Sequence, residues 1–290
     1  MKLMKSLFFS LLVVLSLTKV KAQQIEIGLL LGTSHYLGDL SDEKINFKNT
    51  YFAASLFGRY NFSNKVAVSG MASFGTVSGD DKQSSLESSK LRNLNFSSSI
   101  YEFSVRLEYN LLKNDLRNIS NRPFIPYVFA GLGVFKFNPQ TTYIDGAGVK
   151  ITKELQPLAT EGQGSTVYNE KKKYDLTEII IPMGIGFRTR ISDAFYLGIE
   201  AGVRFTTTNY LDDVGGVYAD NTVVRANTGL VASQLADRRW EVSPLDGQGF
   251  YKENEKRSRR SLLENDAYFI TGITISYMIR SKGQACPTFN

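Results

Sequence analysis

The sequence has few of the residues from which catalytic and metal centres are built. Its 290 residues include one histidine, His35, one cysteine, Cys286, and one tryptophan. A single cysteine cannot form a disulfide within the chain, and neither it nor His35 has the spaced partners of a metal site. These shortages predict a protein that is not an enzyme and that has no cofactor and no metal site.

Long apolar runs are also scarce, because no stretch after residue 22 reaches the 18 apolar residues typical of a membrane-spanning helix. At the N-terminus, Lys2 and Lys5 precede an apolar stretch over 7–17, and the small residues Val20 and Ala22 follow it. This order is typical of a secretory signal peptide, here residues 1–22. The apolar stretch is shorter than the ~20 residues of a spanning helix, so a retained anchor is the less favoured alternative.

The charge balance excludes one class of partner. Residues 1–22 hold four of the 34 basic residues and none of the 28 acidic ones, so the exported chain has 30 basic and 28 acidic residues. A nearly neutral chain lacks the overall positive charge of a nucleic-acid-binding protein. We therefore expect no nucleic-acid partner.

Alternation of apolar and polar residues is the dominant pattern after residue 22. In 101–111, Tyr101, Phe103 and Val105 begin an apolar face, while Glu102 and Arg106 lie on the polar face. A period of two indicates a β-strand. Seven more segments alternate in this way: 25–32, 52–60, 66–74, 127–138, 178–190, 195–205 and 269–280. In 127–138 we assign Tyr127, Phe129, Phe135 and Phe137 to the apolar face.

Eight amphipathic strands fit a soluble barrel or sandwich, with an apolar interior, or a membrane barrel with an apolar exterior. The polar faces carry charges of both signs: Glu26, Arg59, Glu102, Arg106, Glu108, Glu178, Arg188, Arg190, Glu200, Arg204 and Arg280. Such charges can pair inside the narrow lumen of an eight-stranded barrel. Aromatic residues near strand ends fit a membrane interface: Tyr60, Phe74, Tyr101, Tyr109, Phe137, Phe187 and Phe195. We therefore predict an all-β fold, an eight-stranded antiparallel transmembrane β-barrel of the outer membrane, surrounded by lipid.

The connections between strands predict the orientation. The links 61–65 and 192–193 are tight turns and 112–123 is moderate, whereas 37–50, 79–95, 139–174 and 210–266 are long. Short turns of outer-membrane barrels lie in the periplasm and long loops face outside. Both termini of the barrel (23–280) and the tail 281–290 are then periplasmic.

Other motifs carry weaker signals. Ser34 and His35 could suggest a lipid hydrolase, but neighbours in a strand point to opposite faces. The acidic pairs 80–81 and 212–213 could bind a divalent cation with loop carbonyls, although solvated loop acids are the favoured interpretation. The basic run 252–260 could contact phosphates of the outer leaflet, and a solvated loop is again favoured.

Several segments resemble the PorG-type barrel family of the Bacteroidota. They follow in order along nearly the whole exported chain: GTSHYLGDL (32–40), YNFSN (60–64), SGDD (78–81), RNLNFSSSIYEFSVRLEYNL (92–111), PYVFAGLGVFKFNP (126–139), PLATEGQG (157–164), NYLDDVGGVY (209–218) and CPTF (286–289). Each motif alone is weak, whereas the ordered set is fairly specific.

The resemblance implies a non-enzymatic part in the type IX secretion system. Members of that family are associated with a periplasmic ring of PorK and PorN, and gliding depends on the system in some species. On this basis the short turns and the tail are the surfaces that a ring could reach, and we expect Cys286, Pro287 and Phe289 to contribute to docking. The alternative is an adhesin-like surface barrel whose long loops bind host or envelope ligands.

Overall fold

The computed structural model describes residues 24–41, 49–112, 124–192, 194–242, 251, 253–258 and 265–279. The predicted signal peptide lies outside the described residues. So does the predicted tail, 281–290, with Cys286, Pro287 and Phe289.

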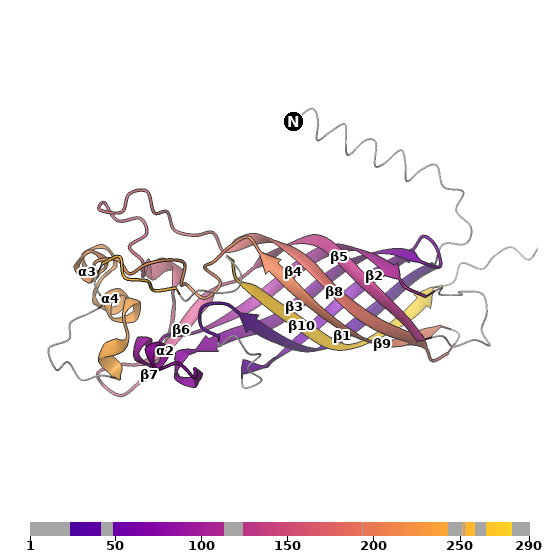
Figure 1. Ribbon diagram of the computed structural model, residues 1–290, viewed down its shortest axis with the longest axis horizontal. Coiled ribbons are helices and arrows are strands. Elements are labelled where there is room, and N and C mark those ends of the chain that lie inside the picture. Colours follow the sequence, from indigo (N-terminus) through magenta and orange to yellow (C-terminus); the bar gives the residue numbers. More distant parts are fainter. Residues whose placement is uncertain are drawn as a thin grey trace, which may run out of the picture.

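Eight antiparallel strands form a closed barrel (Figure 1). They are β1 (Gln24–Leu37), β2 (Tyr51–Asn61), β3 (Val66–Asp80), β4 (Asn95–Asn110), β5 (Phe124–Lys136), β8 (Thr177–Arg190), β9 (Phe195–Thr206) and β10 (Ala267–Ile279). Each strand pairs with the next one along the chain, and the pairing of β1 with β10 closes the ring. The predicted fold class and its eight strands are confirmed.

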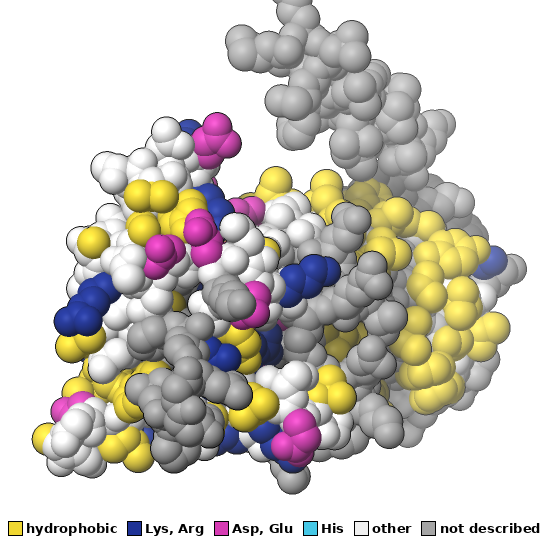
Figure 2. Space-filling model, turned by 60° about the vertical axis from the view of Figure 1, so that its left-hand side comes forward, with side chains coloured by type: hydrophobic (Ala, Val, Ile, Leu, Met, Phe, Trp, Pro, Cys, Tyr) yellow, Lys and Arg dark blue, Asp and Glu magenta, His cyan; other side chains and the backbone are white. Residues whose placement is uncertain are grey.

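The barrel wall is apolar outside and polar inside. Along β4, exposed and buried residues alternate from Phe96 to Asn110, with Phe103 and Leu107 outside and Glu102 and Arg106 inside. Figure 2 shows apolar side chains over the barrel wall, whereas charged side chains of both signs lie over the loop end. An apolar exterior around a polar interior is the arrangement of outer-membrane barrels and the reverse of a soluble barrel.

The lumen has two zones. Toward the long loops, inward side chains of several strands form an apolar plug with residues of the loops: Leu30, Tyr36, Leu40, Ala53, Val77, Leu94, Phe96, Ile100, Phe135, Phe137, Leu155, Ile180, Leu211, Val214, Tyr268 and Ile270. The charged side chains occupy the rest of the lumen. Side chains of both zones fill the interior, as expected for eight strands.

Strand β5 corrects the predicted faces. Val128, Leu132 and Val134 lie outside, whereas Tyr127 and Phe129 point into the lumen. Both faces of β5 are apolar, so alternation alone could not choose between them. The lumen face holds the larger aromatic side chains because they pack against arginines and against the plug.

The predicted aromatic belt is largely present but has one wrong member. Phe74, Tyr101, Tyr109, Phe187 and Phe195 are exposed on the exterior. Phe137 is buried instead, because it stacks between Phe135, at 5.1 Å, and Tyr174, at 6.3 Å between ring centroids. This stack belongs to the apolar plug.

The loops carry structure that the sequence analysis did not predict. The hairpin of β6 (Pro139–Ile144) and β7 (Lys150–Glu154) extends the sheet beyond the barrel by pairing with the start of β4. Helices α2 (Glu87–Arg92), α3 (Asn221–Thr228) and α4 (Leu230–Ala236) and the short 3-10 turns η2 (Asp81–Gln83), η3 (Gln156–Leu158) and η4 (Arg239–Glu241) lie in the same loops. In the described part of the chain, every helix is too short or too polar to cross a membrane.

The exterior face predicts the effect of a misplaced charge. Ile199, in the middle of β9, is 62% exposed on the exterior, and Val149, beside β7 in a loop, is 54% exposed. We expect Ile199→Arg to lower the free energy of unfolding in lipid vesicles by about 2–4 kcal/mol, because arginine in hydrocarbon is costly. Val149→Arg, the matched control, should unfold at the wild-type urea concentration; equal effects of both changes would contradict a lipid-facing Ile199.

Candidate functional site

The centre of the lumen is an ion-pair network built from facing strands. Arg59 on β2 lies directly opposite Glu26 on β1 in the register, and its Nη1 is 2.6 Å from Glu26 Oε2. Its Nε lies 2.7 Å from Oε2 of Glu108 on β4. All three side chains are buried. One guanidinium thus bridges two carboxylates from different strands, because its fork of N–H donors can reach both.

A second arginine links opposite parts of the wall. Arg106 on β4 reaches Glu200 on β9, with 2.6 Å between Nη1 and Oε1, and also contacts Glu108 at 3.4 Å. The Tyr127 hydroxyl donates to Glu200 at 2.8 Å, and the Arg106 guanidinium lies 4.4 Å from the ring centroid of Phe129. The aromatic face of β5 therefore supplies both a hydrogen bond and cation–π contacts to the network.

The remaining lumen arginines extend the network toward both ends. Arg204 pairs with Glu102 at 3.1 Å, near the apolar plug. Near the short-turn end, Arg188 lies 3.7 Å from Glu26 and donates to Asn110 at 3.0 Å. Of the eleven charged residues that the sequence analysis assigned to the polar faces, the ion pairs of the lumen join eight: Glu26, Arg59, Glu102, Arg106, Glu108, Arg188, Glu200 and Arg204.

Glu178 departs from that prediction. It lies on the inward parity of β8, but near the loop end of the strand, where it is half-buried and accepts a hydrogen bond from Thr207 at 2.7 Å. Glu178 is the second residue of β8, at the rim of the barrel, and this position separates it from the lumen arginines. Arg280 lies outside the described residues.

The described parts of the long loops contain buried charges where the sequence analysis favoured solvated ones. Arg257, from the basic run, is buried and pairs with Glu161 at 3.2 Å and Asp213 at 3.6 Å. Arg92 at the end of α2 pairs with Asp81 at 2.7 Å. Both solvated-loop interpretations are wrong for these residues, because loops distant in sequence fold against one another and enclose them.

A carboxyl pair joins the last long loop to the barrel. The Tyr36 hydroxyl lies 2.6 Å from Asp212 Oδ2 and 3.2 Å from Asp266 Oδ1, and the carboxylates also accept backbone N–H groups of Val214 and Leu211. Burial, and then neighbouring carboxylates, raise the pKa of Asp212 and of Asp266 well above the usual range. One hydroxyl hydrogen cannot serve both carboxylates, so a shared proton satisfies the cluster best.

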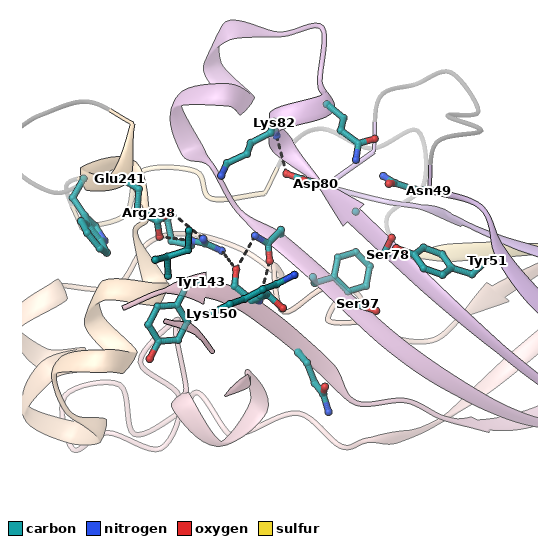
Figure 3. Close-up of a pocket in the computed structure, with 18 of the residues that line it drawn as sticks. Asn49, Tyr51, Ser78, Asp80, Lys82, Ser97, Tyr143, Lys150, Arg238 and Glu241 are labelled. Carbon is teal, nitrogen blue, oxygen red and sulfur yellow. Dashed lines mark hydrogen bonds and ion pairs between the residues drawn. The ribbon is translucent and has the colours of Figure 1, made fainter. Parts of the chain in front are cut away.

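A polar cavity of about 850 Å³ opens beside these loops (Figure 3). Its wall comes from the loop ends of β3 and β4, from β6 and β7, and from η4. Tyr51 and Ser78 lie at one end of the view, and Arg238 and Glu241 lie at the other. Arg238 pairs with Glu241 at 2.7 Å and donates to the Thr142 carbonyl at 3.2 Å. We call this cavity the outer groove.

Ser34 and His35 lie on opposite faces of β1 and do not meet each other. Ser34 is buried and donates to the Thr76 carbonyl at 2.6 Å, whereas His35, on the other face of β1, lies 3.2 Å from Thr33 and 3.3 Å from Thr50. Within the described residues no group of three His, Cys, Asp or Glu side chains could hold a metal ion.

The lumen network predicts a large cost for a single uncompensated change. Glu102 pairs with Arg204 and also accepts hydrogen bonds from Tyr268 and Ser104. Arg204→Met leaves the buried carboxylate without its counter-charge, and we expect a loss of about 3–5 kcal/mol in urea unfolding. Adding Glu102→Gln should recover most of that loss, because the neutral amide oxygen can accept from Tyr268 while its NH2 group donates to the Ser104 hydroxyl oxygen. Additive losses in the double variant would contradict this coupling.

The carboxyl pair predicts a pH-dependent loop. The pKa values of both carboxyls in the folded loop lie above the ordinary value of 3.8, so the folded loop binds more protons than the unfolded loop. The stability of the loop therefore falls as the pH rises from the ordinary pKa through the raised one. We expect amide protection over 209–214 to fall from pH 5 to pH 9 in wild type and to change less in Asp266→Asn. Asp220→Asn, at the half-buried N-cap of α3, should behave as wild type. Protection that rises with pH would refute the shared proton.

Comparison with known proteins finds no match among curated sequences. Similar solved structures include Ail, the attachment invasion locus protein of Yersinia pestis, solved with the heparin analogue sucrose octasulfate (10% identity, 89% of this chain, 100% of that chain, TM-score 0.38). Neisserial surface protein A is also similar (8% identity, 89% of this chain, 97% of that chain, TM-score 0.38). So is the N-terminal barrel domain of Pseudomonas aeruginosa OprF (10% identity, 88% of this chain, 97% of that chain, TM-score 0.31). A family model described as a domain of unknown function, DUF6089, matches residues 5–161 and 160–242, and the chain belongs to that family.

Proposed function

We propose that this protein is a non-enzymatic outer-membrane component of the type IX secretion system that docks the periplasmic PorK and PorN ring to the membrane. The ordered resemblance of its segments to PorG-type barrels supports the assignment. The mechanism is inferred from one observation, the filled lumen. Ion pairs fill it toward the short-turn end, and the apolar plug fills it toward the long loops. A barrel filled in this way acts through its two ends and not as a passage.

The ends of the barrel differ in a way that suits docking. The short turns after β2 and β8 lie at the same end as the start of β1 and the end of β10, and the long loops lie at the other end (Figure 1). We infer that the short-turn end is periplasmic, as in other outer-membrane barrels. Phe62, Leu112 and Ile191 are exposed there and offer apolar contacts to a ring.

The proposal is tested by affinity capture and by deletion. Pull-down of the full-length protein from outer membranes should recover PorK and PorN, and a deletion strain should lose export of cargo with C-terminal signals. Both results are expected if the barrel anchors the ring. Normal export in the deletion strain, with no ring protein recovered, would reject the secretion role.

The tail gives a sharper prediction, although it lies outside the described residues. We expect Cys286, with Pro287 and Phe289, to contribute to docking, through a mixed disulfide with a ring protein. Non-reducing electrophoresis of wild type and Cys286→Ser should show an adduct in the first only. If wild type shows no cysteine-dependent adduct, the disulfide is wrong; Pro287→Ala with Phe289→Ala then tests the remaining contact by pull-down.

A second candidate function is favoured by the outer groove. A surface barrel whose folded loops bind host or envelope ligands would need a cavity on the loop end, and the groove provides one. In that case the deletion strain would export cargo normally and lose adhesion.

A further inference from the structure

The outer groove lies on the exterior side of the barrel wall, just beyond the apolar belt. Ser78 on β3 is opposite Ser97 on β4. Both lie on the exterior face of their strands, as Phe74 and Tyr101 do. The rings of Phe74 and Tyr101 are 5.3 Å apart and exposed, and they mark the upper edge of the belt. Beyond them the exterior residues of both strands are polar.

The groove lies just above the polar layer of an ordinary bilayer. Ser97 is four residues from Tyr101, which is about 13 Å along a strand. With a strand tilt of about 40°, the groove floor lies roughly 10 Å above the aromatic edge. The polar layer of a bilayer is about 5–8 Å thick on each side, so a groove at this height faces lipids whose headgroups project above it.

The groove contains hydrogen-bonding groups that have no partner among the described residues. Asn49, Ser78, Ser97 and Gln140 line it, and their side chains make no hydrogen bond to any described residue. Amides and hydroxyls both donate and accept, as sugar hydroxyls do. Tyr51 adds an exposed aromatic ring.

The charges of the groove favour an anionic ligand. Its lining has three cations, Lys82, Lys150 and Arg238, and two carboxylates, Asp80 and Glu241, which leaves a net charge of +1. Arg238 is neutralised by Glu241. Lys82 and Lys150 are exposed, come from opposite sides of the groove and have no ion-pair partner among the described residues. Two free ammonium groups are suited to phosphate oxygens.

We propose that the outer groove binds a phosphorylated saccharide, presented as the headgroup of a glycolipid in the outer leaflet. The amides and hydroxyls hold the sugar, and Lys82 and Lys150 hold the phosphate. This site does not depend on the secretion role, because it lies at the end of the barrel opposite the short turns.

The only tryptophan of the chain reports on the site, since Trp240 lines the groove. The full-length protein is placed in phosphatidylcholine vesicles with or without lipid A, a phosphorylated glucosamine disaccharide lipid. A separate titration uses the same disaccharide without acyl chains. We expect Trp240 fluorescence to change with lipid A in the vesicle. If Trp240 responds to both lipid A and the soluble disaccharide, the headgroup is sufficient for binding. If it responds to the soluble disaccharide and not to lipid A in the vesicle, the ligand is a free saccharide.

Matched variants separate groove binding from general attraction. Lys82→Gln with Lys150→Gln should weaken the affinity about tenfold. Lys153→Gln with Lys172→Gln should leave it unchanged, because Lys153 lies on the other face of β7 and Lys172 lies outside the lining. Ser97→Phe fills the floor without removing a charge and should abolish the response. No fluorescence change with either probe, equal affinity of the two lysine variants, or an equal response to the unphosphorylated disaccharide would overturn the proposal.

Discussion

The structure depends on the neutralisation of charge inside a lumen that is cut off from water. Four glutamates, 26, 102, 108 and 200, and five arginines, 59, 106, 188, 190 and 204, are buried there. A buried charge without a partner costs several kcal/mol, so each arginine must find carboxylates or aromatic faces within reach. Strand register places Arg59 opposite Glu26 on the next strand, whereas other pairs, such as that of Arg106 on β4 with Glu200 on β9, reach across the lumen. A slip of one residue would place the same charges in lipid.

The five arginines and four carboxylates also explain the aromatic side of β5. Five arginines and four glutamates are buried in the lumen, and the rings of Tyr127 and Phe129 lie beneath three of the guanidiniums. Tyr196 similarly lies 5.5 Å from the guanidinium of Arg190. Aromatic faces therefore share the stabilisation of positive charge with the carboxylates. They also occupy the lumen, which leaves the two rims as the places where this barrel can act.

The barrel could be predicted from the sequence because alternation is a local signal. Strands such as β4 have one apolar and one charged face, and only one orientation in lipid is possible. Strand β5 was ambiguous because both of its faces are apolar, and the decision came from arginines on β2, β4 and β8. The same limit applies to Glu178, whose chemistry matches the lumen but whose position near the strand end does not.

The loop end could not be predicted, because its contacts join segments that are far apart. Arg257 meets Glu161 and Asp213, 96 and 44 residues away, and Arg92 also donates to the carbonyls of Asp39 and Arg257. The outer groove likewise takes its wall from β3, β4, the β6–β7 hairpin and η4. Local polarity suggested solvated loops, since charged residues in a loop are usually exposed.

These long-range pairs have a functional consequence. They join the loops into one folded cap, and the Tyr36 hydroxyl ties that cap to the barrel through Asp212 and Asp266. A cap with buried ion pairs holds a groove in a fixed shape, which favours recognition of a defined ligand over contact through flexible loops. Because the filled lumen separates this cap from the short-turn end, the proposed glycolipid site and the proposed ring-docking site lie on independent surfaces.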